Sequence, residues 1–587
     1  MARRGLVGCS LTSEGRHGAG VVSAWMSYTT GHGGEGAAGV SCLPISAGSL
    51  PSGTAERSGP TRLASGLARP PAAQTPNWAI RPIQEESGGT QLEAVRPIMV
   101  SVELESGPVA DANRLGADAV QELVGVFSRA RARENLPGIS FGVVCSAGML
   151  CSGYEGSAEL APEVGITART VFRIASMTKS VTACCVLMLR DAGMLDLDDP
   201  VGTYLPGFRQ LGHPVELAQP VTLRNLLTMS AGLVEDDPWA DRQLDMTAGA
   251  FDALLNSGIP LNHPPGFEFE YSNLGYAILG RVVEVVTTKS LPEFASQRLL
   301  QPLGMAATCF ELEEVPSELR ATGYRISAGQ AIPERPLHHG AFGAMGGLWT
   351  SVGDFSRYAQ FHLRCEAGDE PNRASPISST TVREMQQPQR AIRPGRAIRA
   401  GVGGVGYGFG LFSGWHPRQG QVLFHSGGLP GFGSHVEWLP ECDLAVFAFA
   451  NATYAPMRAA VGEAIEALDS AGLLVPKAVE PAPELIRARD LAVRAYQEGT
   501  LAGLAEIAAS NLFLDRDLES RSREISELRG QHGRCTKVGP LGSRARLRAH
   551  FTLHCEAGDL RCELWLSPTS PARVQLMSFA SVAAEPD

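Results

Sequence analysis

The sequence predicts an α/β fold of the α+β type, in which helices flank an antiparallel sheet and a helical subdomain is inserted into it. Strand-like segments occur near residue 140 and again after residue 347. The pattern between 191 and about 301 is mainly helical and is broken by Pro and Gly. Strands at both ends of a region with helices between them are typical of a sheet whose first and last strands meet.

The composition allows several domains and argues against some partners. A chain of 587 residues, 44% hydrophobic and 19% charged, can bury more than one core. Its net charge of −11 and pI near 5.7 give no electrostatic footprint for nucleic acid. No apolar run is long enough for a membrane span, and we expect no membrane partner. Twelve cysteines without Cys-x-x-Cys spacing predict no metal site and, with no export signal recognised, a cytoplasmic location.

Four segments are expected along the chain. Residues 1–112 are rich in Gly, Ser, Ala and Pro, lack periodicity, and are predicted to be disordered; a start at Met99 is an alternative. A large globular domain follows at 113–474, and a Pro-rich linker at 475–483. Residues 484–587 are predicted to form a small α+β accessory domain without an evident chemical constellation.

Hydrophobic periodicity places the elements within these domains. The large domain should begin with a helix over 112–133 and a hairpin over 138–146 and 149–156. After the helical insert we expect strands at Gly347–Thr350, Tyr407–Phe412, Val422–Ser426, Ser434–Leu439 and Leu444–Ala450, and a helix at 456–470. The accessory domain should contain helices at 484–498 and 501–510 and strands at 545–554 and 560–567.

Ser176 and Lys179 form the first candidate for catalytic chemistry. Apolar residues after Ser176 follow the stripe of a half-buried helix: Val181, Cys184, Cys185, Met188 and Leu189. Ser176 therefore lies at a helix N-terminus, with Lys179 one turn later on the same side. A lysine whose pKa is lowered by burial can take the proton of the serine hydroxyl. The alternative is a capping serine followed by a surface lysine. Lysine is rare here, with four among 50 Lys plus Arg, and arginine cannot act as a base.

Tyr271-Ser272-Asn273 is the second candidate. It precedes a helical pattern, so a bend there would project Tyr271 from the end of an element. A phenol is a useful proton shuttle if a neighbouring ammonium lowers its pKa. The alternative for Asn273 is a structural role as the N-cap of the following helix.

His425-Ser426-Gly427-Gly428 is the third candidate. It follows the apolar run Val422-Leu423-Phe424, and glycines at a strand end allow close approach of a ligand or another backbone. The alternative is a hairpin turn with a half-exposed histidine.

With these three motifs in this order, the chain resembles the serine beta-lactamase-like family. The family includes class C beta-lactamases, D-Ala-D-Ala carboxypeptidases, D-aminopeptidases and related esterases. The resemblance covers roughly residues 113–474. Secondary matches are Leu226–Leu233, Gly346–Trp349 leading into Asp354, and Tyr407–Gly410.

The resemblance implies a catalytic role for each matched residue. Ser176 is expected to attack an acyl carbon after Lys179 removes its proton, and Tyr271 to protonate the leaving group. Asn273 is expected to bind Lys179 or the substrate amide. The oxyanion donors implied are the backbone N–H groups of Ser176 and Gly428. No metal or cofactor is implied.

His425 departs from the class C enzymes, which have lysine at this position. A mostly neutral histidine favours an esterase or D-amino-acid peptidase over a beta-lactamase or carboxypeptidase. We therefore expect a serine hydrolase that cleaves a small-molecule or short-peptide ester or amide. A catalytically silent binding protein with the same fold is the alternative from another class. The sequence predicts no oligomeric state.

Overall fold

The structure is a computed structural model that describes residues 101–103, 114–211, 219–366, 376–393, 400–477 and 479–582. The chain divides into two units, 1–92 and 93–587. Apart from the short strand β1, the segment 1–112 that is predicted to be disordered lies outside the described residues. The domain boundaries remain predictions.

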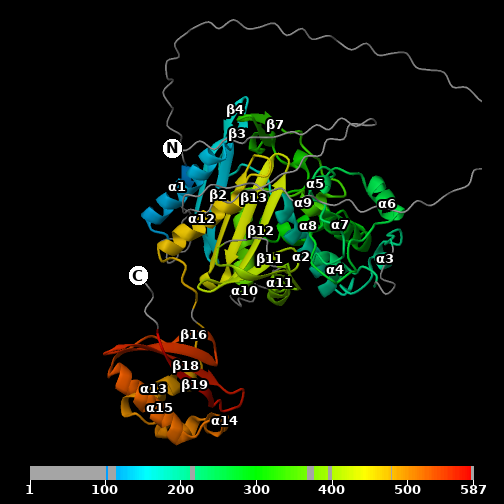
Figure 1. The fold of residues 1–587 in the computed structure, drawn as a ribbon. Helices are drawn as coiled ribbons and strands as arrows, with labels where there is room; N and C mark the ends of the chain where they lie inside the picture. Colours follow the sequence, from blue (N-terminus) through cyan, green and yellow to red (C-terminus); the bar gives the residue numbers. More distant parts are fainter. Residues whose placement is uncertain are drawn as a thin grey trace, which may run out of the picture. The chain divides into compact units, whose positions relative to one another are not determined.

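An antiparallel ten-stranded sheet is the centre of the large domain (Figure 1). Along the sheet the order is β1 (Ser101–Glu103), β3 (Gly148–Leu160), β2 (Gly138–Cys145), β14 (Leu444–Ala450), β13 (Phe432–Leu439), β12 (Gly420–Leu429), β11 (Phe412–His416), β10 (Gly403–Tyr407) and β9 (Arg390–Ala391), and β4 (Glu163–Gly165) pairs with β3. β2 pairs with β14, with Val144 opposite Ala445 and Ile139 opposite Ala450. The first and last strands of the domain therefore meet, as the sequence predicts.

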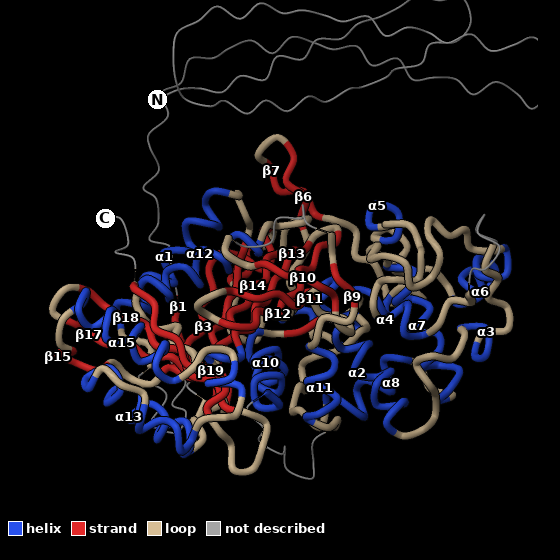
Figure 2. Tube along the Cα trace, turned by 60° about the horizontal axis from the view of Figure 1, so that its bottom comes forward, coloured by secondary structure: helices blue, strands red, loops and turns tan. Residues whose placement is uncertain are grey.

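Helices cover both faces of the sheet, and this explains the continuous apolar sequence of β14. Figure 2 shows α1 (Ala117–Arg133) and α12 (Met457–Ser470) on one side and α10 (Val352–Glu366) on the other. Phe447 of β14 makes an edge contact with Phe355 of α10, whereas its neighbour Val446 belongs to the core under α1 and α12. The predicted fold class is thus confirmed.

The inserted subdomain is helical. Its helices are α2 (Thr178–Asp191), α3 (Val201–Tyr204), α4 (Leu223–Leu227), α5 (Asp237–Ala240), α6 (Ala248–Ser257), α7 (Asn273–Thr287) and α8 (Leu291–Ala295). Before and after α10 the chain adds β6 (Tyr324–Ser327), β7 (Gln330–Pro333), α9 (Gly343–Gly346) and α11 (Ser379–Gln386). Within the part of the chain that the structure describes, no helix is both long and apolar enough to cross a membrane.

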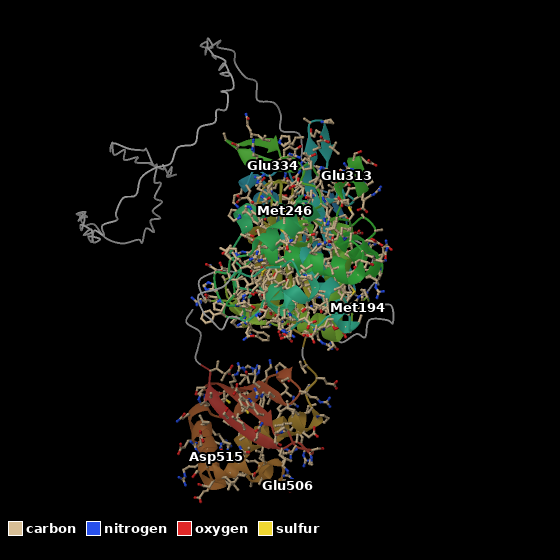
Figure 3. The ribbon with its side chains drawn as sticks, turned by 90° about the vertical axis from the view of Figure 1, so that its right-hand side faces the viewer. Met194, Met246, Glu313, Glu334, Glu506 and Asp515 are labelled. Carbon is tan, nitrogen blue, oxygen red and sulfur yellow. The ribbon has the colours of Figure 1, made fainter. Side chains whose placement is uncertain are left out.

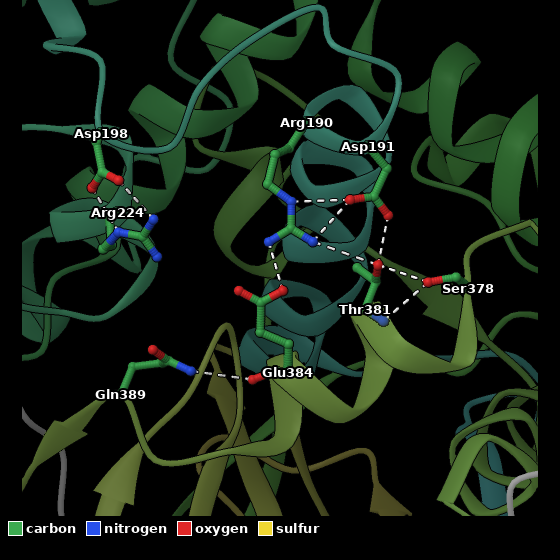
Figure 4. A network of polar contacts seen from close by, with 8 residues as sticks. All are labelled: Arg190, Asp191, Asp198, Arg224, Ser378, Thr381, Glu384 and Gln389. Carbon is green, nitrogen blue, oxygen red and sulfur yellow. Dashed lines mark hydrogen bonds and ion pairs between the residues drawn. The ribbon is translucent and has the colours of Figure 1, made fainter.

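α2 is buried along its length and is anchored at its C-terminal end. Arg190 pairs with Asp191 at 2.8 Å and with Glu384 of α11 at 2.7 Å, and Thr381 donates a hydrogen bond to Asp191 (Figure 4). Near its start, Thr182 donates a hydrogen bond to the carbonyl of Ala344 in α9. These contacts fix the helix that carries the Ser-x-x-Lys motif.

The C-terminal residues form an α+β unit with its own core. The unit contains α13 (Pro483–Glu498), α14 (Asn511–Leu514), α15 (Leu518–His532), β15 (Cys535–Val538), β16 (Gly542–Ala545), β17 (Arg548–Cys555), β18 (Gly558–Leu566) and β19 (Val574–Ser581). Of the helix predicted at 501–510, only a 3-10 segment at Ala502–Ile507 forms. α15 was not predicted, because Ile525 is its one buried residue and the helix has no apolar stripe.

Two predicted strands differ from the structure. Of Gly347–Thr350, only β8 (Trp349–Thr350) is a strand, and it pairs with β5 (Phe172–Arg173) outside the large sheet. The segment Tyr407–Phe412 is the turn between β10 and β11, and only its two end residues belong to strands. Gly410 explains the turn, because its φ of 76° is left-handed and an added Cβ would lie 2.7 Å from the carbonyl oxygen of Lys179. The turn therefore packs directly on the backbone of α2.

Candidate active site

Ser176 lies in a 3-10 turn, Ala175–Met177, immediately before α2. The residue before it, Ala175, has a left-handed φ of 49°, a conformation that non-glycine residues adopt only when their surroundings hold them. Its neighbour Ile174 is fixed by a hydrogen bond from its N–H to Leu348 and by one from the Ser434 hydroxyl to its carbonyl. The sharp turn presents Ser176 at the start of the helix, as predicted.

Lys179 is fully buried, and its amine is placed between three acceptors. Its Nζ lies 3.0 Å from Ser176 Oγ, 2.6 Å from Asn273 Oδ1 and 2.9 Å from the carbonyl oxygen of Met345. An ammonium group has three donors, so the charged form of Lys179 is fully satisfied. The neutral form would direct a lone pair at the serine hydroxyl.

Two opposing effects set the basicity of Lys179. Burial lowers the pKa of the amine to about 8. The carboxylates of Asp237, Asp241 and Asp236 act in the opposite direction and keep that pKa from falling further. An amine with this pKa is neutral in roughly a tenth of the molecules at pH 7. Lys179 is therefore able to act as a base near neutral pH.

Asn273 is the first residue of α7 rather than its N-cap, which is Ser272. A carboxylate from another segment supports this helix start: Asp236 accepts hydrogen bonds from the N–H groups of Asn273 at 2.7 Å and Leu274 at 2.9 Å. The side chain of Asn273 is therefore free for the site. Its Nδ2 donates to Asp237 Oδ1 at 2.6 Å, while its Oδ1 accepts from Lys179.

Tyr271 stands over the same amine, with its ring centroid 4.9 Å from Lys179 Nζ. Burial raises the pKa of its phenol well above 10, and the contact with the Ser176 hydroxyl only partly opposes this. The condition that a neighbouring ammonium lowers the pKa of the phenol is therefore not met, because burial has the larger effect. The neutral phenol is suited to donating a proton rather than to acting as a phenolate base.

His425 lies inside β12 and is 2% exposed, so the alternative of a half-exposed turn is wrong. Its Nδ1 donates to the carbonyl of Ser426 at 2.6 Å, which leaves Nε2 as an acceptor, 3.3 Å from the Tyr407 hydroxyl. Burial, and then the charge of Lys179, lower the pKa of His425 to about 3. The imidazole is therefore neutral across the physiological pH range.

The two glycines after Ser426 have different neighbours. An added Cβ on Gly427 would lie 2.1 Å from the carbonyl oxygen of Ile174, so β12 runs directly against the turn that carries Ser176. At Gly428 it would lie 2.8 Å from the ring of Tyr454. Ser426 projects from the face of β12 opposite to His425 and Gly427, where its Oγ is 2.8 Å from Nδ1 of His435.

The structure thus brings together Ser176, Lys179, Tyr271, Asn273 and His425, and does not bring the Ser426 side chain to them. Sequence reasoning missed the support that Asp236, Asp237 and the carbonyl of Met345 give to Lys179 and Asn273. The acidic run at 235–237 is visible in the sequence, but only the tertiary structure places it beside α7.

A family model described as Beta-lactamase matches residues 119–469, which is more than half of the chain. The chain belongs to the Beta-lactamase family. Proteins of this family are usually serine hydrolases that act on amide or ester bonds. The family thus agrees with the chemistry expected of a buried lysine next to a serine hydroxyl.

Two curated relatives and one solved structure are similar to the chain. Protein flp from Staphylococcus aureus (strain NCTC 8325 / PS 47) is 25% identical over 340 residues, 58% of this chain and 64% of that protein, so the match spans less than two thirds of it. Penicillin-binding protein 4 from Amycolatopsis lactamdurans is 29% identical over 311 residues, 52% of this chain and 76% of that protein. The octameric penicillin-binding protein homologue from Pyrococcus abyssi shares the fold, with a TM-score of 0.51, 21% identity, and coverage of 79% of this chain and 95% of that one.

Proposed function

We propose that the protein is a serine hydrolase that cleaves an ester or amide bond through an acyl-enzyme on Ser176. One observation carries the proposal: the amine of a fully buried Lys179 lies 3.0 Å from Ser176 Oγ, and burial lowers its pKa to about 8. A lysine with this environment is a base matched to neutral pH.

In the first step, neutral Lys179 accepts the Ser176 proton while Oγ forms a bond to the carbonyl carbon of the substrate. The carbonyl electron pair moves to oxygen, where the N–H groups of Ser176 and Gly428 would stabilise the charge. Such preorganised donors contribute about two to three orders of magnitude in rate. The close approach of β12 to Ile174 supports this pairing of donors.

Collapse of the tetrahedral intermediate expels the leaving group, which takes a proton from the Tyr271 hydroxyl. Tyr271 regains a proton from the Lys179 ammonium, so the amine is neutral again. Water then attacks the acyl-enzyme with the same groups acting in reverse, and the acid product leaves. Asn273 holds the Lys179 amine throughout, and the proposed steps use no metal or cofactor.

The neutral imidazole of His425 favours an esterase or D-amino-acid peptidase. A substrate carboxylate would find an uncharged acceptor nitrogen there instead of a cation. Penicillin recognition, as beta-lactamase or D-Ala-D-Ala carboxypeptidase, is the second candidate, because one relative carries the name penicillin-binding protein. A silent binding protein remains the candidate outside the enzymes.

Intact mass spectrometry tests the proposal. The protein is exposed briefly to benzylpenicillin or to p-nitrophenyl butyrate, with Ser176→Ala as the control. We expect an adduct with the ester that is absent from the variant, and Lys179→Arg should form it far more slowly. A stable benzylpenicillin adduct would instead favour the penicillin-recognising candidate. No adduct and no turnover with either reagent would refute the acyl-enzyme and leave the silent binding protein.

A further inference from the structure

A carboxylate that the proposed chemistry does not use lies beside β12. Asp241 follows α5, and its Oδ2 accepts a hydrogen bond from the Tyr454 hydroxyl at 2.9 Å. The ring of Tyr454 lies against Gly428, the residue whose N–H is the proposed oxyanion donor. Tyr454 is 50% exposed, whereas Asp241 is 3% exposed. The pair therefore places a buried carboxylate behind a half-exposed ring that lies against β12 at Gly428.

The carboxylate of Asp241 has few hydrogen-bond donors around it. Among the described residues, only Tyr454 donates a hydrogen bond to it, and its Oδ1 has no donor. Burial and the neighbouring charge of Asp237 raise the pKa of Asp241 to about 7. A carboxylate removed from water with one hydrogen bond is strongly stabilised by an added cation.

Asp241 is also within electrostatic range of the reacting groups. Its charge, with that of Asp237, acts on both Lys179 and Tyr271. Asp237 accepts a hydrogen bond from Asn273, and Asp241 is connected to Gly428 through Tyr454. The two carboxylates therefore lie along the same side of the site. The N–H of Asp241 donates to the carbonyl of Asp237, and further along the chain the carbonyl of Met246, labelled in Figure 3, accepts from the N–H of Ala341.

The basic side chains near Asp241 either have acceptors elsewhere or are uncharged. Lys179 has three acceptors of its own, and His425 is neutral. Arg242, beside Tyr454, pairs with Glu334 at 3.6 Å. Asp236 is committed to the start of α7. Asp237 is bonded to the same helix through Asn273, whereas Asp241, in the described part of the chain, has no bond to α7 and is available for a charge brought by the substrate.

We propose that the acyl part of the substrate carries an ammonium group and that Asp241 binds it, held in place by Tyr454. The inference rests on the proposed function, because it describes the substrate of the same Ser176 site. An α-amino ester or amide has this chemistry, since its protonated amine lies two bonds from the carbonyl carbon that Ser176 would attack. Asp241 is then the residue that distinguishes a free amine from a blocked one.

A pair of substrates that differ only at the amine tests this inference. Kcat/KM is measured at pH 7 for alanine methyl ester and N-acetylalanine methyl ester, each as both enantiomers. We expect the free amine to be preferred about 10- to 100-fold in one enantiomer, the range of a charged hydrogen bond. Asp241→Asn should bring that ratio close to one. Removing a charge near Lys179 changes both esters alike, so the ratio isolates recognition of the amine.

Asp198→Asn is the matched control, because Asp198 is exposed and pairs with Arg224 on the surface; this variant should keep the wild-type ratio. Equal rates for both esters, or a preference for the acetylated one, would overturn the inference while hydrolysis itself upholds the proposed function. A second measurement applies if turnover of the esters is slow. Alanine amide and N-acetylalanine amide are compared for the concentration at which each slows the labelling of Ser176 by p-nitrophenyl butyrate. We expect alanine amide to act at the lower concentration. Equal protection would overturn the inference, whereas absence of any labelling would refute the proposed function instead.

Discussion

Replacing Asp237 by asparagine is expected to shift the pH dependence of hydrolysis toward acid. Asp237 is connected to Lys179 through Asn273, by two hydrogen bonds of 2.6 Å on opposite sides of one amide group. The carboxylate stabilises the charged form of the lysine and therefore raises its pKa. Asparagine keeps an oxygen for the Asn273 Nδ2 donor and removes only the charge.

The size of the shift follows from the separation. Two hydrogen bonds and the amide between them put the carboxylate about 7 Å from the ammonium, which corresponds to about 2 kcal/mol at an effective dielectric constant of 20. Asp237 is only partly buried, so solvent screening reduces the effect, and we expect a pKa change of about one unit. The pKa of Lys179 would fall from about 8 to about 7.

The assay is kcat/KM for a neutral ester, p-nitrophenyl butyrate, between pH 5 and pH 10. Activity requires neutral Lys179, so the rate rises with pH through the lysine pKa and then levels off. For the wild type the midpoint should lie near pH 8. In Asp237→Asn the ratio of kcat/KM at pH 6 to its plateau value should rise about tenfold. The surface variant Asp198→Asn should leave the midpoint unchanged.

A midpoint that stays near pH 8 in Asp237→Asn would refute the reasoning that this carboxylate tunes the lysine. A midpoint near pH 6.5 in both proteins, lost on replacing His425, would contradict the buried, neutral histidine. The high-pH limb gives a further check, because burial raises the pKa of Tyr271 well above 10 and no decline is expected before that pH.

Three further outcomes follow from the geometry. Tyr271→Phe should lower kcat/KM by about two to four orders of magnitude without changing the circular dichroism spectrum, and near-native activity would exclude Tyr271 as the acid. Gly427→Ala should lower the free energy of unfolding by about 2 kcal/mol, because the new Cβ meets backbone, whereas Gly403→Ala meets nothing within 4 Å and should be neutral in urea titrations. Burial lowers the pKa of His362 to about 3. Below pH 6.5 the histidine of the unfolded chain therefore becomes protonated, whereas that of the folded protein stays neutral. The free energy of unfolding should therefore fall by about 2 kcal/mol between pH 6.5 and pH 5 through this residue. In His362→Gln this part of the acid destabilisation should be absent. An unchanged dependence of the free energy of unfolding on pH would contradict the burial of His362.

The sequence was sufficient for the features that depend on local pattern. Alternating and continuous apolar runs located β12, β13 and β14, and the helical stripe after Ser176 located α2. The three motifs named the groups that the structure brings together around Lys179. Their catalytic roles remain predictions.

Features that depend on distant contacts were beyond the reach of the sequence. The burial that neutralises His425 and raises the pKa of Tyr271 comes from aromatic rings on separate strands, such as Phe412 and Tyr407. The aromatic residues at 407–412 have the sequence pattern of a strand, but they form a turn because Gly410 packs against α2. Asp237 can be recognised as a charged residue in the sequence, but its effect on Lys179 depends on the position of α7, whose first residue, Asn273, lies between them.

The pairing of β2 with β14 has a consequence for how the protein is made. Val144 and Ala445 are partners in the sheet, yet 301 positions separate them along the chain (445 minus 144). At translation rates of about 5–20 residues per second, β2 is synthesised about 15–60 seconds before its partner. During that interval one edge of an apolar strand has no hydrogen-bonding neighbour, which invites aggregation. Nascent chains of this protein should therefore require protection by chaperones until residue 450 has left the ribosome.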